Sequence, residues 1–136
     1  MRKSFIASTV YLALGLIAGV FYREYTKAYN FPEGSPTQLS VLHTHLLTLG
    51  FLFFLIVLVL DKQFNLSEDS RFKTFFWSYN AGLVITIGIM TWHGMLTVQG
   101  VTGISKAIPG IAGLGHVLLG LGLTFFMLTL GSKLKK

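Results

Sequence analysis

The sequence predicts an all-α fold in which a single domain of 136 residues forms a bundle of four transmembrane helices. Hydrophobic residues make up 52% of the chain and charged residues only 12%, a balance typical of membrane proteins. Four apolar runs are each long enough to cross a hydrocarbon core about 30 Å thick. These runs cover residues 5–22, 38–60, 75–98 and 108–130, and all five acidic residues lie between them.

The first run follows a short basic start at residues 1–3 and ends at Tyr22. A basic start before an apolar stretch is also typical of a secretory signal peptide, which is the alternative interpretation of this run. We favour a membrane span, because the run is long and lacks a clean A-x-A cleavage motif. Gly15 and Gly19 lie four residues apart, a spacing that lets a second helix approach closely.

Capping motifs predict where the next two helices begin. The segment Ser35-Pro36-Thr37-Gln38 resembles a capping box with proline at the first helical position, so the second helix is expected to begin there. In Ser67-Glu68-Asp69, the serine is expected to cap the third helix and the two acids to occupy its first turn. Asn80, the one amide near the start of the third run, is expected to bond a neighbouring helix.

The fourth run contains Pro109 near its start and an unusual number of small residues. Such residues occur where membrane helices contact each other closely. They are Gly110, Ala112, Gly113, Gly115, Gly120 and Gly122.

Basic residues predict the orientation of the bundle. Of the eleven lysines and arginines, eight lie before the first run, after the last run, or between the second and third runs. We therefore expect both termini in the cytoplasm and a multi-pass protein of a bacterial cytoplasmic membrane. The net charge of +6 does not indicate nucleic-acid binding, because the basic residues gather at the ends of the runs.

All four histidines lie inside apolar runs. Ionisable side chains at membrane depth are costly and are therefore functional candidates. At ~1.5 Å per residue, His43 and His45 are expected roughly 8 and 11 Å below the outer edge of the bilayer, His93 roughly 9 Å and His116 about 12 Å. The four imidazoles should therefore lie at one level in the outer half of the membrane.

This arrangement makes His43, His45, His93 and His116 candidate ligands of a cofactor. Residues two apart on a helix differ in direction by about 200°, so His43 and His45 cannot easily share one metal ion. Small residues on the histidine-bearing faces would leave room for a flat ligand, which favours a b-type haem with histidine as axial ligand.

Two alternatives stay open. The imidazoles suit direct binding of copper or zinc, or they form hydrogen bonds between helices in a structural or accessory subunit. Thiolate ligands are excluded because the chain has no cysteine.

The segment His43-Thr44-His45 is similar to the H-x-H pair of the catalytic subunit of haem–copper oxidases and nitric oxide reductases. The resemblance implies that His43 or His45 is an axial haem ligand, with His93 or His116 opposite. It also implies a homotrimer, because that subunit is built from three arcs of four helices. The further copper-binding histidines of the superfamily are missing here. As a whole, the chain resembles a small uncharacterised family of four-span bacterial membrane proteins.

The expected function is therefore electron transfer, or haem sensing or handling, by a homo-oligomer with a redox partner. An oxidoreductase component is one form that this function could take. The haem propionates would point outward, where Arg23, Lys27 or Lys106 could pair with them.

Overall fold

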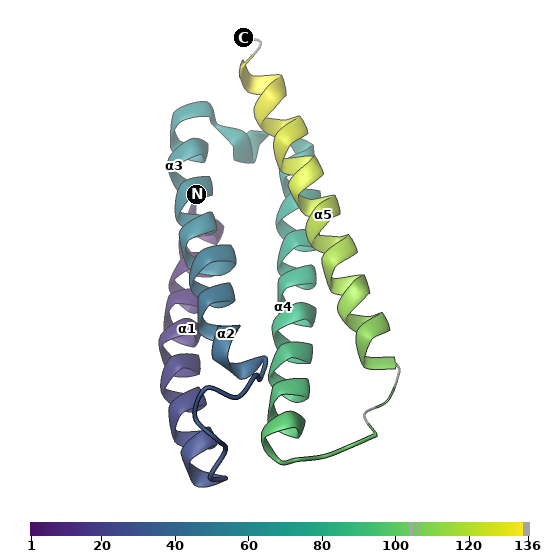
Figure 1. Ribbon diagram of the computed structural model, residues 1–136. Helices are drawn as coiled ribbons and strands as arrows, with labels where there is room; N and C mark the ends of the chain where they lie inside the picture. The colour runs from purple at the N-terminus through teal and green to yellow at the C-terminus, as the bar shows by residue number, and fades with distance from the viewer. Residues whose placement is uncertain (104, 106, 135–136) are drawn as a thin grey trace.

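The computed structural model describes residues 1–103, 105 and 107–134. The described elements are α1 (Arg2–Ala28), α2 (Leu39–His45), the π-helix η1 (Leu46–Leu52), α3 (Phe53–Phe64), the 3₁₀-helix η2 (Leu66–Glu68), α4 (Ser70–Val98) and α5 (Ala107–Leu134). Because α2, η1 and α3 are continuous, the described residues form four long helices that run alternately up and down the bundle (Figure 1). All four are long and apolar enough to cross a membrane, which confirms the predicted helical class and indicates a multi-pass membrane protein.

The second span begins later than its sequence predicted. Ser35 and Pro36 lie before the helix, which begins at Leu39. The backbone N–H of Leu39 donates to the Thr37 hydroxyl at 3.3 Å, and that hydroxyl donates to the Gly94 carbonyl of α4 at 3.1 Å. The start of the second span is therefore set by a contact with α4 rather than by the predicted capping box.

The start of α4 was also predicted two residues too early. Asp69 takes the capping role expected of Ser67, because its carboxylate accepts a hydrogen bond from the Arg71 backbone N–H at 2.9 Å. The same carboxylate also accepts a hydrogen bond from the Arg71 guanidinium at 2.6 Å. These bonds hold the pKa of the Asp69 carboxyl well below its ordinary value. The Ser132 hydroxyl of α5 donates to the same carboxylate at 3.1 Å, so this connection also holds the end of α5.

A seven-residue π-helix begins directly after His45, and the sequence pattern did not predict it. π-Helical turns are rare in proteins, and those that do occur are often found at functional sites. Hydroxyls from neighbouring helices donate to two of its carbonyls, since Tyr79 bonds Leu49 at 2.9 Å and Ser8 bonds Phe51 at 3.1 Å. These side chains satisfy backbone groups that the membrane interior would leave without a partner.

Glycines bring α4 and α5 into close contact. A Cβ atom added at Gly82 would lie 2.6 Å from the Leu119 backbone nitrogen and 2.7 Å from the Gly115 carbonyl oxygen. One added at Gly122 would lie 2.8 Å from the Cβ atom of Tyr79. We refer to Gly82, Gly115 and Gly122 as the glycine seam. Close contact through small residues is the usual way in which membrane helices pack.

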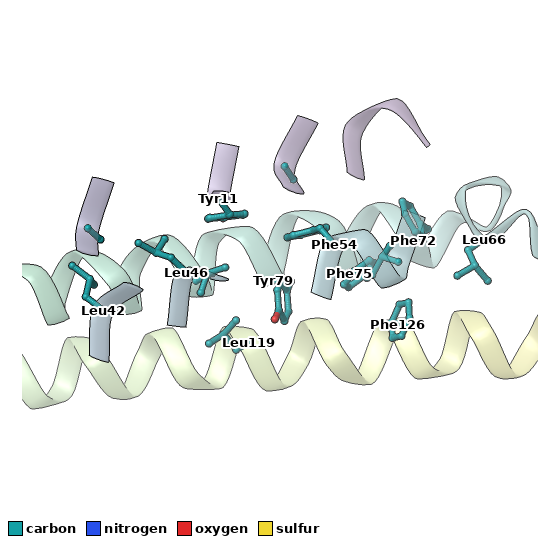
Figure 2. Packing of buried hydrophobic residues seen from close by; sticks show 14 of the residues in the cluster. Tyr11, Leu42, Leu46, Phe54, Leu66, Phe72, Phe75, Tyr79, Leu119 and Phe126 are labelled. Atoms are coloured by element: carbon teal, nitrogen blue, oxygen red, sulfur yellow. The ribbon is translucent and has the colours of Figure 1, made fainter. Parts of the chain in front are cut away.

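An aromatic cluster joins α3, α4 and α5 near the α3–α4 connection (Figure 2). The ring centroids of Phe53 and Tyr79 lie 4.5 Å apart, and those of Phe75 and Phe126 lie 5.0 Å apart. Phe54 packs edge-on against Tyr79 with centroids 5.6 Å apart. These five rings pack against one another and hold α3, α4 and α5 together in one half of the bundle.

The first helix packs against the second span along α2, η1 and α3. A Cβ added at Gly15 would lie 2.6 Å from a methyl carbon of Leu47. The second helix therefore approaches closely at Gly15, as the spacing of the glycines predicted. The Tyr11 hydroxyl donates to the Asn80 side-chain oxygen at 2.9 Å, which confirms the predicted bond between Asn80 and a neighbouring helix. α1 is therefore held both by close packing and by a polar contact with α4.

We predict that Gly82→Ala destabilises the bundle by about 1–3 kcal/mol, because the added methyl group would overlap the α5 backbone. The matched control is Gly88→Ala in the same helix, where an added Cβ meets nothing within 4 Å. That substitution should be neutral or slightly stabilising. Thermal unfolding of both variants in detergent measures the difference, and equal melting temperatures would show that the glycine seam is not a close contact.

Candidate functional site

Three of the four histidines line a single groove of about 550 Å³ between the second span, α4 and α5. We call it the histidine groove. His45 comes from the second span, His93 from α4 and His116 from α5. The other lining residues are Gln38, Val41, Thr86, Ile89, Met90, Ile108, Pro109, Ala112 and Gly113. Its volume is typical of small-molecule sites.

The groove exists because α5 is held close to α4 along the glycine seam while its N-terminal part leans away from α2 (Figure 1). At this end, α2 contacts α4 instead, since a Cβ added at Gly94 would lie 2.8 Å from the Leu39 backbone nitrogen. A Cβ added at Gly110 or Gly113 of α5 meets nothing within 4 Å. The groove therefore lies between the second span, α4 and the N-terminal part of α5.

His45 and His116 are held in the same way. The Nδ1 atom of His45 lies 2.9 Å from the Val41 carbonyl oxygen, and that of His116 lies 2.8 Å from the Ala112 carbonyl oxygen. Because a carbonyl only accepts hydrogen bonds, each contact is a hydrogen bond only when Nδ1 carries the proton, and Nε2 is then the nitrogen that could bind a ligand. Metal-ligating histidines are typically oriented by this kind of bond.

His93 differs in its hydrogen bonding. Its Nδ1 atom is buried and has no hydrogen-bond partner among the described residues. A buried polar atom without a partner costs about 1–3 kcal/mol. Among the three imidazoles of the groove, His93 is therefore the one whose Nδ1 atom has no hydrogen-bond partner in the described protein.

His43 does not line the groove. It faces α1, where its Cβ lies 3.9 Å from a Cβ added at Gly19. Its Nδ1 atom is buried without a partner among the described residues, and its Nε2 atom lies 3.4 Å from the Thr44 hydroxyl. The two histidines of the H-x-H segment therefore face different helices, as their spacing predicted.

The predicted small residues divide between packing and the groove. Ala112 and Gly113 line the groove beside His116, whereas Gly82 contacts α5. Gly50, seven residues after His43 and therefore on the same helix face, contacts the Tyr11 ring. Room beside the imidazoles therefore comes from fewer small residues than expected.

Three residues of the groove were not predicted as part of a site: Gln38 was expected only in a capping box, Pro109 only near the start of its helix, and Met90 had no predicted role. Helical spacing could have identified them, because residues three, four and seven positions apart share a helix face. Gln38 and Pro109 each precede a groove histidine by seven residues, and Met90 precedes His93 by three.

The chemistry of the groove is limited to imidazoles, one amide and one hydroxyl within apolar walls. The Thr86 hydroxyl is already bonded to the Gly82 carbonyl at 2.9 Å. No acidic residue lines the groove. Across the described ranges, no group of three His, Cys, Asp or Glu side chains is placed to hold a metal ion.

Comparison with known proteins places the whole chain in one family. No curated protein and no solved structure matches it. Residues 1–133 match the family described as "Protein of unknown function (DUF2871)". The match extends over all four helices, and the chain therefore belongs to this uncharacterised family.

Proposed function

We propose that the protein binds a b-type haem in the histidine groove and serves in electron transfer, or in haem sensing or handling. The observation that carries the proposal is that imidazoles from three separate helices line one mainly apolar groove. Histidines at membrane depth are functional candidates by default. Because three of the histidines line the same groove, a shared ligand explains their positions better than a separate structural role for each one.

The arrangement favours haem over a bare ion. A bare copper or zinc ion needs three or four protein ligands gathered around one point, and the described residues form no such group. Haem supplies four nitrogen ligands of its own and needs only one or two from the protein. Its flat shape suits separated imidazoles across an apolar groove.

Residues of the groove take distinct roles in this proposal. His45 and His116 would hold the haem iron through Nε2, because their Nδ1 atoms lie against backbone carbonyls. His93 would donate a hydrogen bond to the bound group or replace one of these ligands. The apolar walls, including Val41 and Ile89, would exclude water and tune the reduction potential. When bound, haem would supply a one-electron redox centre.

The orientation and assembly belong to the same proposal. The excess of basic residues at the end that holds both termini supports an orientation with that end in the cytoplasm, and the groove would then lie in the outer half of a bacterial cytoplasmic membrane. Arg23 and Lys27, at the end of α1, could then pair with haem propionates. Lys106, the third residue expected in that role, lies outside the described residues. The resemblance to haem–copper oxidases supports a homotrimer, and a role in electron transfer would require a redox partner.

We predict a Soret band in protein purified after expression with ample haem, and a change in the spectrum on reduction with dithionite. His45→Ala and His116→Ala should each weaken hemin binding at least about tenfold, equivalent to about 1.4 kcal/mol, because each removes a ligand candidate. His43→Ala is the matched control, since His43 lies outside the groove.

Titration of the purified protein with hemin separates the alternatives. A colourless protein with stoichiometric copper or zinc by elemental analysis would contradict the haem proposal in favour of direct metal binding. A colourless, metal-free protein that copurifies with a partner would indicate an accessory subunit. Equal loss of hemin binding in His43→Ala and His45→Ala would refute the assignment of the groove.

The orientation predicts opposite labelling of two single-cysteine variants, because the natural chain has no cysteine. Glu33→Cys lies in the exposed connection after α1, and Gln63→Cys lies near the exposed connection before α4. In intact cells, a membrane-impermeant thiol reagent should label the former and spare the latter until the cells are opened. The reverse pattern would place the groove in the cytoplasmic half of the membrane.

A further inference from the structure

A second site lies on the face formed by α1 and α4, away from the histidine groove. It consists of two adjoining hollows that share Lys3, Phe76 and Trp77. One, of about 340 Å³, is lined by Arg2, Lys3 and Lys73 among others and lies at the end of the bundle that holds both termini. The other, of about 380 Å³, continues from it along the two helices. We call them the basic hollow and the apolar hollow.

The basic hollow carries positive charge that the protein does not neutralise. The three acids at this end are each paired already: Asp61 with the Met1 amino group, Glu68 with Lys133 and Asp69 with Arg71. Arg2, Lys3 and Lys73 are exposed and form no ion pair within the described part of the chain. The hollow therefore suits an anion.

The apolar hollow has the chemistry of a hydrocarbon site. Its lining includes Ile6, Val10, Leu14 and Val84, and among the described residues that line it Lys3 alone is charged. The Asn80 side-chain oxygen, its one amide acceptor, is bonded to the Tyr11 hydroxyl. From Lys3 to Leu14 the helix rises about 16 Å at 1.5 Å per residue. This is close to one leaflet, or half of a core about 30 Å thick.

Two aromatic side chains mark the boundary between the hollows. Trp77 is 58% exposed and, like Phe76, lines both. Tryptophan is enriched where membrane helices meet the headgroup region. The sequence of cations, aromatic rings and aliphatic side chains along this face therefore follows the order of a phospholipid from headgroup to acyl chain.

We propose that this face binds one anionic phospholipid, such as phosphatidylglycerol, from the leaflet that contacts the termini. Arg2, Lys3 and Lys73 hold the phosphate, and an acyl chain lies in the apolar hollow between α1 and α4. Basic pockets between membrane helices bind anionic headgroups in this way. The site is separate from the histidine groove and does not depend on haem binding.

Native mass spectrometry of the full chain released from detergent tests the proposal by titration with three probes. Phosphatidylglycerol should bind with one tight site, phosphatidylcholine at least about tenfold more weakly, and glycerol phosphate should not displace the lipid. The combined variant Lys3→Gln and Lys73→Gln should weaken phosphatidylglycerol binding at least about tenfold. The control Lys62→Gln removes an exposed cation at the same end that lines neither hollow, and should leave binding unchanged.

A second pair of variants tests the apolar hollow without changing charge. Val10→Trp should fill the hollow and weaken phosphatidylglycerol binding, because Val10 is 48% exposed within it. Val117→Trp, at a 67% exposed position of α5 outside the hollow, is its control. Equal affinity for the two lipids, displacement by glycerol phosphate, or equal effects of each variant and its control would overturn the proposal.

Discussion

The close contact of α4 with α5 along the glycine seam is the interaction on which the rest of the structure depends. Gly82 and Gly115 leave no room for a side chain between the two backbones, and Gly122 packs against Tyr79. Near the same end, the aromatic cluster ties α3 to both helices. Neither the glycine seam nor the aromatic cluster extends to the N-terminal end of α5. That part of α5 is therefore separated from α2, and the histidine groove lies there.

This division separates the tightly packed half of the bundle from the half that holds the histidine groove. The half nearer the termini carries the packed aromatic rings and the paired acids, whereas the other half carries two imidazoles whose Nδ1 atoms lie against backbone carbonyls. The π-helix after His45 lies where these halves meet. The hydroxyls of Ser8 and Tyr79 donate hydrogen bonds to two carbonyls of this π-helix, so these carbonyls have partners within the protein and need no water.

The sequence predicts the four helices and much of the site, because both follow from periodic patterns. Apolar length predicts the spans, and the 200° between His43 and His45 predicts that only one of them enters the groove. The π-helix was not predictable, because it depends on contacts with α1 and α4. The start of α2 was missed for the same reason, since Thr37 bonds Gly94 in another helix. The small residues could be listed, but which of them face α4 and which face the groove depends on the tilt of α5.

The second span and α5 both line the histidine groove, and we propose that haem lies between its imidazoles. Val41 and Ala112 line that groove from opposite helices and are not histidines. The most direct measurement is the rate at which a short bifunctional maleimide links Val41→Cys to Ala112→Cys, with and without hemin. We expect rapid linkage, which hemin slows when it binds to the same protein. Linkage that is absent, or that proceeds equally fast with hemin bound, would contradict the proposal.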